Sequence, residues 1–596
     1  MGTTIGTIIK ELREEQDISR SKLCKGICSA QMLNLIEQDA CETDKYMLDI
    51  LLQRLGKSPD RLELIISNEE YKSMRVRDLI EELCWKKKKE KALYLLEKYM
   101  NCFPGKNNVL KIYELRINAY ISRRIDGDST AAEDAIINTL EITLPGIDEK
   151  NMLQYMISST EMENLLALGL CLIDKEDLCA AEGLLEACRS YIISRMSDEE
   201  QRAAIYSKCA WLLSKVYIKQ QKISEAYYCC EEAVRGLGKY GNLYFMLPLL
   251  EQLVFCSDEM KLNRMNNCWI RYREVLQWLY DSYGMKWYCH DSLFHNFCRL
   301  ALHLDSEFIR QERQAKRITQ EKLIEGVYQS PESLSRVESG KVRPSKTKFE
   351  GLLKNLGIER GRICGTLAVE NFQALEMKQQ IAIFIGEGDY ERAKLKLSEL
   401  ESMLNMEWKI NQMIVGNYRE VLNSHLMEGY AREALENQIK LLQLTYWTEK
   451  KQFERVPMQS ELLIFNAMVI NLKKLGMRDE AVSILQQIVD TIKRSKMNDH
   501  YRSHIASLPY VNFAINTDNE ELCKRGLQYE LRCDNAVQLP HYLEALSNIA
   551  ETQGKRQEAE KMLLYAYRLC EIFNRTAYKA ILKDMYEELT GQCLSD

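Results

Sequence analysis

The chain has 596 residues, 46% hydrophobic and 28% charged, which is a globular composition spread over more length than a single hydrophobic core supports. The net charge of −6 excludes a polycation that coats nucleic acid along its whole length, so any DNA contact needs a local basic face. We find no apolar run long enough to span a membrane, no secretory leader and no disulfide-type spacing among the twenty cysteines, which favours a cytoplasmic protein with reduced thiols.

Helix-forming residues dominate the sequence. Leu, Glu, Lys, Ala and Met are abundant, whereas nine prolines and 27 glycines are few for this length, and no alternating Val/Ile/Thr-rich runs stand out. We therefore predict an all-α protein. The motifs described below divide it into four predicted domains, at residues 1–66, 67–303, 304–365 and 366–596.

A short motif occurs twice, about half a chain apart. Residues 18–37 read ISRSKLCKGICSAQMLNLIE and residues 318–338 read ITQEKLIEGVYQSPESLSRVE, so that Ile36 and Val337 stand 301 residues apart. Each copy has the anatomy of a helix-turn-helix domain, whose third helix enters the major groove of DNA. The predicted landmarks of the two copies are the N-caps Ser19 and Thr319, the turn glycines Gly26 and Gly326, and the N-caps Ser29 and Ser330. Two such motifs indicate a duplicated regulator, a dimer written as one polypeptide.

The first copy carries a negative local charge. Residues 3–66 hold 9 Lys/Arg and 11 Asp/Glu, and the segment after the third predicted helix reads QDACETDK. Its acidic residues would repel DNA phosphates: Asp39, Glu42 and Asp44. The candidates for DNA contact are Arg20, Gln31 and Asn34, since Gln and Asn side chains can pair bidentately with adenine. Two interpretations stay open: weak DNA binding beside a stronger twin, or a domain kept for packing.

The second copy carries a positive local charge. Residues 307–363 hold 13 Lys/Arg and 8 Asp/Glu. We expect a first helix over Phe308–Lys316, and a third helix that starts after Ser330 with Pro331 at its first position, where a missing N–H costs little. The candidates for phosphate contact lie at helix ends and in the following loop: Gln320, Lys341, Arg343 and Lys346. The candidates for reading bases are Ser330, Glu332, Ser333 and Arg336.

Each motif is followed by a long helical region with a recurring turn signal of the form G-x-x-x-E-A. It reads GDYERA at 388–393, GYAREA at 429–434, GMRDEA at 476–481 and GKRQEA at 554–559, with weaker versions at 87–92, 176–181, 221–226 and 518–523. In the second half the small residues lie 41, 47, 42 and 36 residues apart, somewhat more than the 34-residue tetratricopeptide period. We predict a tetratricopeptide-like α-solenoid with a concave groove after each motif.

Asparagines recur at one register of the second-half repeats. The position six residues before the first residue of the turn holds Asn423, Asn512 and Asn548. The position ten residues before the turn holds Arg419 and Asn466 in their repeats. An amide offers both a donor and an acceptor, so a ladder of Asn side chains can hold the backbone of an extended peptide. Asn is also a common surface residue, and that simpler interpretation stays open. The candidate peptide-binding residues are Arg419, Asn423, Asn466, Asn512 and Asn548.

The modules GICSAQMLNLIEQD and GVYQSPESLSRVESG, each followed by tetratricopeptide-like repeats, resemble the RRNPP group of peptide-responsive quorum-sensing regulators, once per half of the chain. The resemblance implies a cytoplasmic transcription factor with Xre-type helix-turn-helix domains, which binds a double-stranded DNA operator and a short signalling peptide. Members are typically about half this length and dimerise through their repeats. The chain therefore resembles a tandem pseudo-dimer, either monomeric or paired again as a homodimer.

Other functions remain open at this point. One is a protein-interaction regulator of the Rap type, whose helix-turn-helix domains do not act on DNA; the acidic first copy favours it and the basic second copy opposes it. Another is a repressor whose signal is not a peptide. We expect no enzyme and no cofactor, because we find no glycine-rich phosphate loop and no nucleophile elbow. We assign core and surface roles rather than metal binding to one helical cluster: Cys289, His290, His295 and Cys298.

Overall fold

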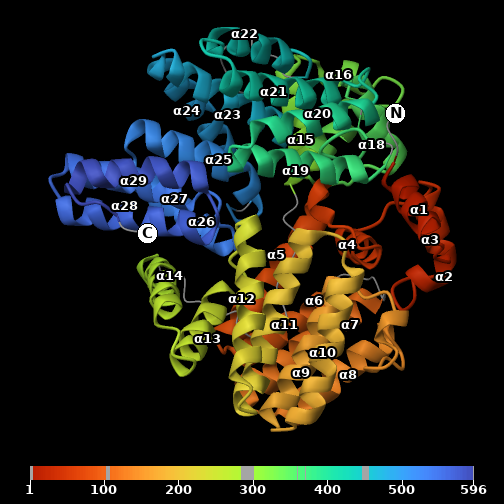
Figure 1. Cartoon of the computed structure of the whole chain (residues 1–596). Coiled ribbons are helices and arrows are strands. Elements are labelled where there is room, and N and C mark those ends of the chain that lie inside the picture. The colour runs from red at the N-terminus through yellow and green to blue at the C-terminus, as the bar shows by residue number, and fades with distance from the viewer. Residues whose placement is uncertain are drawn as a thin grey trace. The chain divides into compact units, whose positions relative to one another are not determined.

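The computed structural model describes residues 4–102, 108–283, 301–358, 360–369, 371–445, 455–497 and 499–594. These residues form 29 α-helices and three short strands (Figure 1). The all-α prediction is therefore confirmed, with a small sheet that it did not include. Within the described parts of the chain, no helix is long and apolar enough to cross a membrane.

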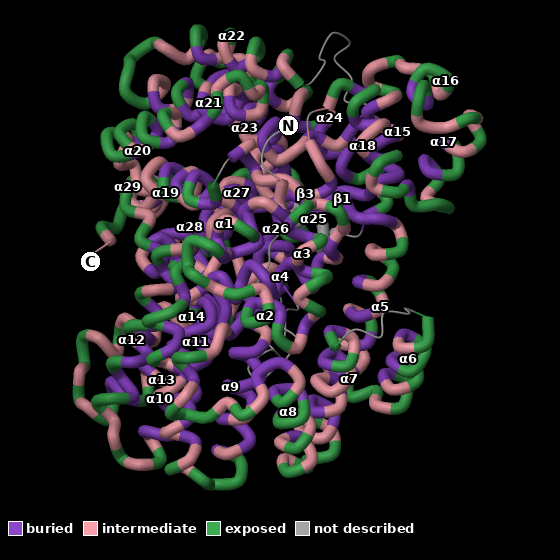
Figure 2. Tube along the Cα trace, turned by 90° about the vertical axis from the view of Figure 1, so that its right-hand side faces the viewer, coloured by how far each residue is buried: buried purple, intermediate pink, exposed green. Residues whose placement is uncertain are grey.

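Contacts divide the chain into two compact units. Unit 1 comprises residues 1–8, 60–68 and 300–596, and unit 2 comprises residues 9–59 and 69–299. In each unit the buried residues lie where helices pack against their neighbours (Figure 2). Unit 1 thus takes two short segments, residues 1–8 and 60–68, from the first half of the sequence.

Each predicted helix-turn-helix motif folds into four helices. The first head consists of α1 (Ile5–Glu15), α2 (Arg20–Leu23), α3 (Ala30–Glu37) and α4 (Lys45–Arg54). The second head consists of α15 (Asp305–Ala315), α16 (Gln320–Leu323), α17 (Pro331–Glu338) and α18 (Lys346–Asn355). The starts of α2 and α16 are 300 residues apart and the ends of α3 and α17 are 301 apart, so the turn of the first copy is one residue shorter.

The predicted caps and turns are present in both heads. The hydroxyl of Ser19 accepts from the N–H of Lys22 at 3.2 Å, and that of Ser29 accepts from the N–H of Met32 at 3.1 Å. The turn glycines of the two heads have φ of 73° and 72°. Ser330 stands at the N-cap of α17 with Pro331 after it, although its side chain accepts no capping hydrogen bond. Local sequence signals therefore fix the ends of these helices.

Two series of antiparallel helices follow the heads. The first arm contains α5 (Asn68–Trp85), α6 (Lys89–Cys102), α7 (Asn108–Ile121), α8 (Ser129–Thr143), α9 (Ser159–Asp174), α10 (Leu178–Arg195), α11 (Glu199–Lys219), α12 (Ile223–Tyr240), α13 (Met246–Glu259) and α14 (Asn263–Ser282). The second arm contains α19 (Gln373–Glu387), α20 (Tyr390–Met403), α21 (Lys409–Leu426), α22 (Ala431–Leu442), α23 (Gln459–Lys474), α24 (Arg478–Arg494), α25 (Asp499–Thr517), α26 (Glu520–Arg532), α27 (Leu539–Thr552), α28 (Arg556–Ile572) and α29 (Thr576–Thr590). Consecutive helices pack side by side in each arm, as an α-solenoid requires.

The repeated turn signal has the structure predicted for it. Its first residue has positive φ in all eight copies, between 49° and 80°, which glycine adopts without steric cost and other residues rarely adopt. The small residue five positions later is fully buried between the paired helices in every copy: Ala92, Ala181, Ala226, Ala393, Ala434, Ala481, Cys523 and Ala559. The signal therefore marks helix pairs in both arms, including the copies that lack glycine.

A three-stranded sheet joins distant parts of the sequence within unit 1. Its strands are β1 (Leu62–Ile66), β2 (Ala301–Leu304) and β3 (Ile363–Gly365), in the order β2-β1-β3, with β2 parallel and β3 antiparallel to β1. Glu63 lies opposite Cys364, 301 residues further on, which is the spacing of the two motifs. In a two-fold symmetric strand pair each central residue faces its own copy. The β1–β3 pair therefore has the register of a homodimer interface inside one chain.

This register predicts a specific cross-link. Directly opposed residues of antiparallel strands have Cα atoms about 4.5–5.5 Å apart, within the range that a disulfide spans. We expect Glu63→Cys to form a disulfide with Cys364 on mild oxidation, detected by mass spectrometry of a proteolytic digest. Leu62→Cys serves as the control, because its side chain points to the other face of the sheet. If the control cross-links to Cys364 as readily as Glu63→Cys, the register is wrong.

Candidate functional site

Both heads are stabilised by the same buried ion pair between their first and third helices. Arg13 Nε lies 2.6 Å from Glu37 Oε1, and Arg313 Nε lies 2.5 Å from Glu338 Oε1. Burial raises the pKa of the Glu37 carboxyl, but hydrogen bonds from Arg13 and Arg20 outweigh it and the pKa is lowered. The third helix of each head is thereby held in a fixed orientation.

The same glutamates hold two of the predicted DNA-contact residues. Arg20 Nε lies 2.6 Å from Glu37 Oε2, and the amide of Gln320 donates to Glu338 Oε2 at 2.8 Å. Part of the positive charge of Arg20 is thus neutralised within the first head by Glu37, which also pairs with Arg13. Gln320 carries no charge, so the second head loses no positive charge in the equivalent contact.

The candidate DNA contacts of the second head gather along α17 and the loop after it. Glu332 and Arg336 are exposed on α17, and Lys341 and Arg343 are exposed in the loop. The remaining candidates are half-buried: Gln320, Ser330, Ser333 and Lys346. Lys346 Nζ lies 3.9 Å from a carboxylate oxygen of Glu350, one helical turn further along α18. The arrangement places base-reading candidates on the third helix and cations beside it, as a helix-turn-helix requires.

The first head presents different chemistry at the equivalent positions. On α3, Gln31 is exposed and Asn34 is half-buried, with Asn34 Oδ1 accepting from Gln38 at 3.4 Å. Met32 and Leu35 are also exposed on this helix, at 38% and 37%. The sequence analysis did not single them out, although 301 residues further on the second head has Ser333 and Arg336. Aligning the two copies would have found this difference.

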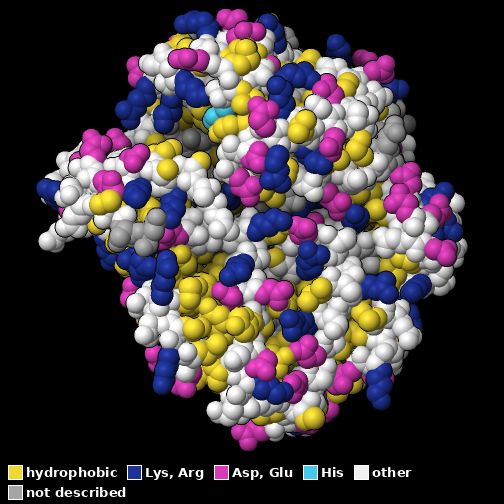
Figure 3. Space-filling view, viewed as in Figure 1, with side chains coloured by type: hydrophobic (Ala, Val, Ile, Leu, Met, Phe, Trp, Pro, Cys, Tyr) yellow, Lys and Arg dark blue, Asp and Glu magenta, His cyan; other side chains and the backbone are white. Residues whose placement is uncertain are grey.

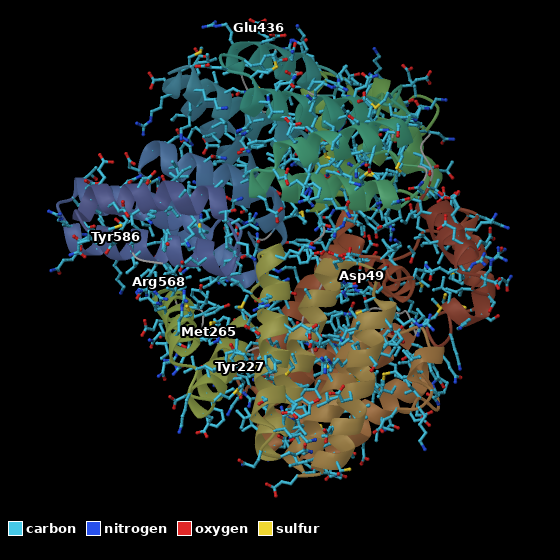
Figure 4. The ribbon with its side chains drawn as sticks, viewed as in Figure 1. Asp49, Tyr227, Met265, Glu436, Arg568 and Tyr586 are labelled. Atoms are coloured by element: carbon cyan, nitrogen blue, oxygen red, sulfur yellow. The ribbon has the colours of Figure 1, made fainter. Side chains whose placement is uncertain are left out.

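The cations of the first head are largely paired internally. Lys45 is buried on α4, and its Nζ lies 2.5 Å from Oδ2 of Asp49. Asp49 is one of the residues labelled in Figure 4. Asp44, predicted to repel phosphate, instead accepts the N–H of Met47 at 2.9 Å as the N-cap of α4. Figure 3 shows acidic and basic side chains interspersed over the visible surface, in keeping with the net charge of −6.

An arginine joins the first head to its arm within unit 2. Arg54, on α4, donates to the carbonyls of Leu23 and Lys25 at 2.8 Å each and forms a buried ion pair with Glu161 on α9. The turn glycine Gly26 lies against the backbone of α8: a Cβ at this position would come within 2.2 Å of the carbonyl oxygen of Ile142. The first head is therefore attached through the turn between α2 and α3.

The second head is attached to its arm through its first helix instead. Within unit 1, Arg455 Nε lies 2.7 Å from Glu312 Oε1 on α15, and its terminal nitrogens contact both oxygens of Glu461 on α23. Glu307 on the same helix accepts from the hydroxyl of Ser495 at 2.9 Å. The turn of the second head has open space around Gly326, with no heavy atom within 4 Å of an added Cβ.

Glutamates at equivalent positions of the two arms take part in attaching the first and the second head. Glu161 and Glu461 are 300 residues apart, and each is the third residue of its helix and accepts from the N-cap N–H in a capping box. Burial raises the pKa of each carboxyl, but the charge and hydrogen bonds of Arg54 and Arg455 respectively outweigh it and lower the pKa. The two halves thus use one position of the repeat to hold the head, with arginines from different elements.

The predicted peptide-binding asparagines lie on alternate helices of the second arm, each of which contacts the next one in the series. Asn423, Asn466, Asn512 and Asn548 are half-buried on α21, α23, α25 and α27, and we call these four residues the amide ladder. The amide of Asn512 donates to Asn466 Oδ1. Arg419 lies on α21 four residues before Asn423 and stays a predicted peptide contact; both oxygens of Glu401 accept from its guanidinium at 2.7 Å.

A second chain of amide side chains, which was not predicted, connects α21, α22 and α23. Asn471 donates to Gln438 at 3.1 Å, Gln438 donates to Asn417 at 3.5 Å, and the hydroxyl of Ser424 donates to Asn471 at 3.2 Å. All three amides are buried. Their hydrogen bonds fix α21, α22 and α23 relative to one another, because a buried amide without a partner is costly.

Metal binding finds no support in the described parts of the chain, where no group of three His, Cys, Asp or Glu residues is placed to hold an ion. The cluster of Cys289, His290, His295 and Cys298 lies outside the described residues.

Solved structures that are similar to this chain include two regulators bound to DNA. They are PlcR of Bacillus thuringiensis with the peptide PapR7 and DNA (16% identity, TM-score 0.31, 46% of this chain and 98% of that one) and ComR of S. thermophilus with DNA and its signalling peptide (13%, 0.28, 48% and 99%). The apo form of RapI is similar over 85% of this chain and 98% of its own, with 12% identity and a TM-score of 0.22. No curated protein matches the sequence.

The helix-turn-helix family matches residues 309–363, which contain most of the second head. The helix-turn-helix is a DNA-binding class, and its third helix reads the major groove. The match therefore identifies a helix-turn-helix domain, of a DNA-binding class, in the second half of the chain.

The unequal attachments of the heads predict unequal effects of one substitution. Gly326→Ala should cost about 1 kcal/mol, because the positive φ alone disfavours alanine. Gly26→Ala adds a clash with the backbone of Ile142 and should cost about 2–4 kcal/mol. Thermal unfolding of the two variants measures the difference. Equal losses of stability would contradict the attachment of the first head through its turn.

Proposed function

We propose that the chain is a cytoplasmic transcriptional regulator of the RRNPP type that binds a double-stranded operator chiefly through its second head. The observation that carries this proposal is the match of residues 309–363 to the helix-turn-helix family, together with the excess of five positive charges over residues 307–363. Exposed cations in the loop after α17 supply the phosphate contacts, and Ser333 and Arg336 on α17 supply base contacts. The first head contributes little DNA affinity, because Arg20 and Lys45 are paired with carboxylates and its third helix exposes apolar side chains.

The amide ladder supports a peptide as the regulating ligand. Each of its residues lies on the first helix of a helix pair, and such residues can bind the peptide backbone whatever the side chains are. The same helix, α23, carries Asn466 and the glutamate that holds Arg455 and, through it, α15 of the second head. A peptide at the ladder therefore acts on an element in direct contact with the DNA-binding head.

The competing function is that of a Rap-type regulator, which binds a partner protein and does not act on DNA. The first head favours it, since Met32 and Leu35 are exposed where a DNA-reading helix carries polar residues. The second head opposes it, since Arg336, Lys341 and Arg343 are exposed on and beside α17. A gel shift with random-sequence DNA separates the two functions, because only a DNA-binding head retards the duplex.

Removing two exposed cations tests the second head. Lys341→Ala with Arg343→Ala should weaken binding to any duplex and lower the slope of log affinity against log salt by about 2, since each lost phosphate contact contributes about 0.9. Fluorescence anisotropy over a salt series measures both quantities. The matched control is Lys22→Ala with Lys25→Ala, two exposed cations of the first head. Equal losses in the two double variants would show that we have ranked the heads wrongly.

Shortening two ladder residues tests peptide binding. Octapeptides selected against the whole chain from a random library should bind Asn466→Ala/Asn512→Ala about tenfold more weakly, since two hydrogen bonds to the backbone contribute about 0.5–1.5 kcal/mol each. Isothermal titration calorimetry measures the affinities. Asn437→Ala is the control, because this half-buried asparagine lies on α22 rather than on a ladder helix. Unchanged affinity in the double variant would exclude the ladder as the site.

A further inference from the structure

The third helix of the first head has an exposed apolar face. Met32 and Leu35 are three residues apart on α3, which places them side by side on one surface of the helix. We call this surface the α3 face; Gln31 and Gln38 are exposed beside it. Single exposed apolar residues are ordinary on protein surfaces. Met32 and Leu35, however, stand where the second head has Ser333 and Arg336. The helix that this fold uses to read DNA therefore carries apolar side chains in place of polar ones.

Acidic residues gather around the C-terminal end of α3, whereas the exposed lysines Lys22 and Lys25 lie on α2 and in the turn after it. Glu14 and Glu15 are exposed at the end of α1, and Glu14 is linked through Arg13 to Glu37 at the end of α3. The loop that follows α3 adds Asp39 and Glu42, where the second head has a basic loop. Negative charge beside the reading helix repels phosphate, so this head is poorly suited to DNA. The same charge attracts a cationic partner.

The α3 face is also rigid. The Ser29 hydroxyl caps the start of α3 and the Arg13–Glu37 ion pair holds its end. Arg54 fixes the preceding turn through the carbonyls of Leu23 and Lys25. A surface held at both ends loses little conformational freedom when a partner docks, which favours binding over a flexible apolar patch.

We propose that the α3 face is a docking surface for a basic amphipathic helix of a partner protein. Apolar residues at i and i+3 or i+4 of that helix pack on Met32 and Leu35, as in other recognition of amphipathic helices. Its Lys and Arg side chains pair with the acidic residues around the face. The first head is thereby a protein-binding module on the DNA-binding fold, and the chain brings a partner to the DNA that its second head binds.

A model peptide tests this proposal on the whole chain. The probe is a fluorescein-labelled 14-residue Leu/Lys amphipathic helix, and its Leu/Glu counterpart is the charge control. We expect the Leu/Lys peptide to bind at least tenfold more tightly than the Leu/Glu peptide in anisotropy titrations. Met32→Ser/Leu35→Arg should weaken Leu/Lys binding at least tenfold. Leu395→Ser should leave it unchanged, since Leu395 is 68% exposed on α20, away from the acidic loop in sequence.

A second variant separates charge from apolar contact. Asp39→Asn/Glu42→Gln keeps both apolar side chains and should weaken Leu/Lys binding several-fold while flattening its salt dependence. Asp39 and Glu42 are half-buried, so circular dichroism melting of both double variants checks that they fold. Equal Leu/Lys affinity in the wild type and in Met32→Ser/Leu35→Arg would overturn the proposal. So would a tenfold loss of affinity for a random-sequence DNA duplex in that variant, which would assign the α3 face to DNA.

Discussion

A buried glutamate at the third position of α9 and of α23 connects each head to its arm. A buried carboxylate needs a cationic partner, and breaking such a pair costs about 3–5 kcal/mol because it leaves a charge uncompensated. Glu161 and Glu461 are equivalent, but Arg54 comes from the turn side of the first head whereas Arg455 comes from the second arm and contacts Glu312. One conserved feature of the repeat therefore holds two heads by different surfaces.

This difference explains why the duplicated halves are not interchangeable. In the second head the turn and α17 stay open, and the cations beside α17 are exposed. In the first head the turn is packed on the arm, and the equivalent helix exposes apolar residues. Allosteric control requires a ligand to favour one of two states of a common element. In unit 1 we propose α23 as that element, since it carries both Asn466 and Glu461.

The sequence predicted what depends on local chemistry. Caps, turn glycines and the small residue of each repeat turn act within a few residues, so Ser29, Gly326 and Ala481 took their expected places. Strand β1 was missed because the run LELII is too short to distinguish a strand from a buried helix turn, and its partners are distant in sequence. Arg54 and Arg455 were missed because their partners come together only in the folded chain. The predicted DNA and peptide contacts themselves remain predictions.

The central claim is that one chain carries two unequal heads, of which the second reads DNA. Selection of bound sequences from a pool of random double-stranded DNA by the full chain tests it most directly. The account predicts that one half-site emerges with a defined base preference and that no second, inverted copy of it is enriched alongside. A palindrome with two equally defined half-sites would contradict the account, because it requires two heads with the same recognition surface.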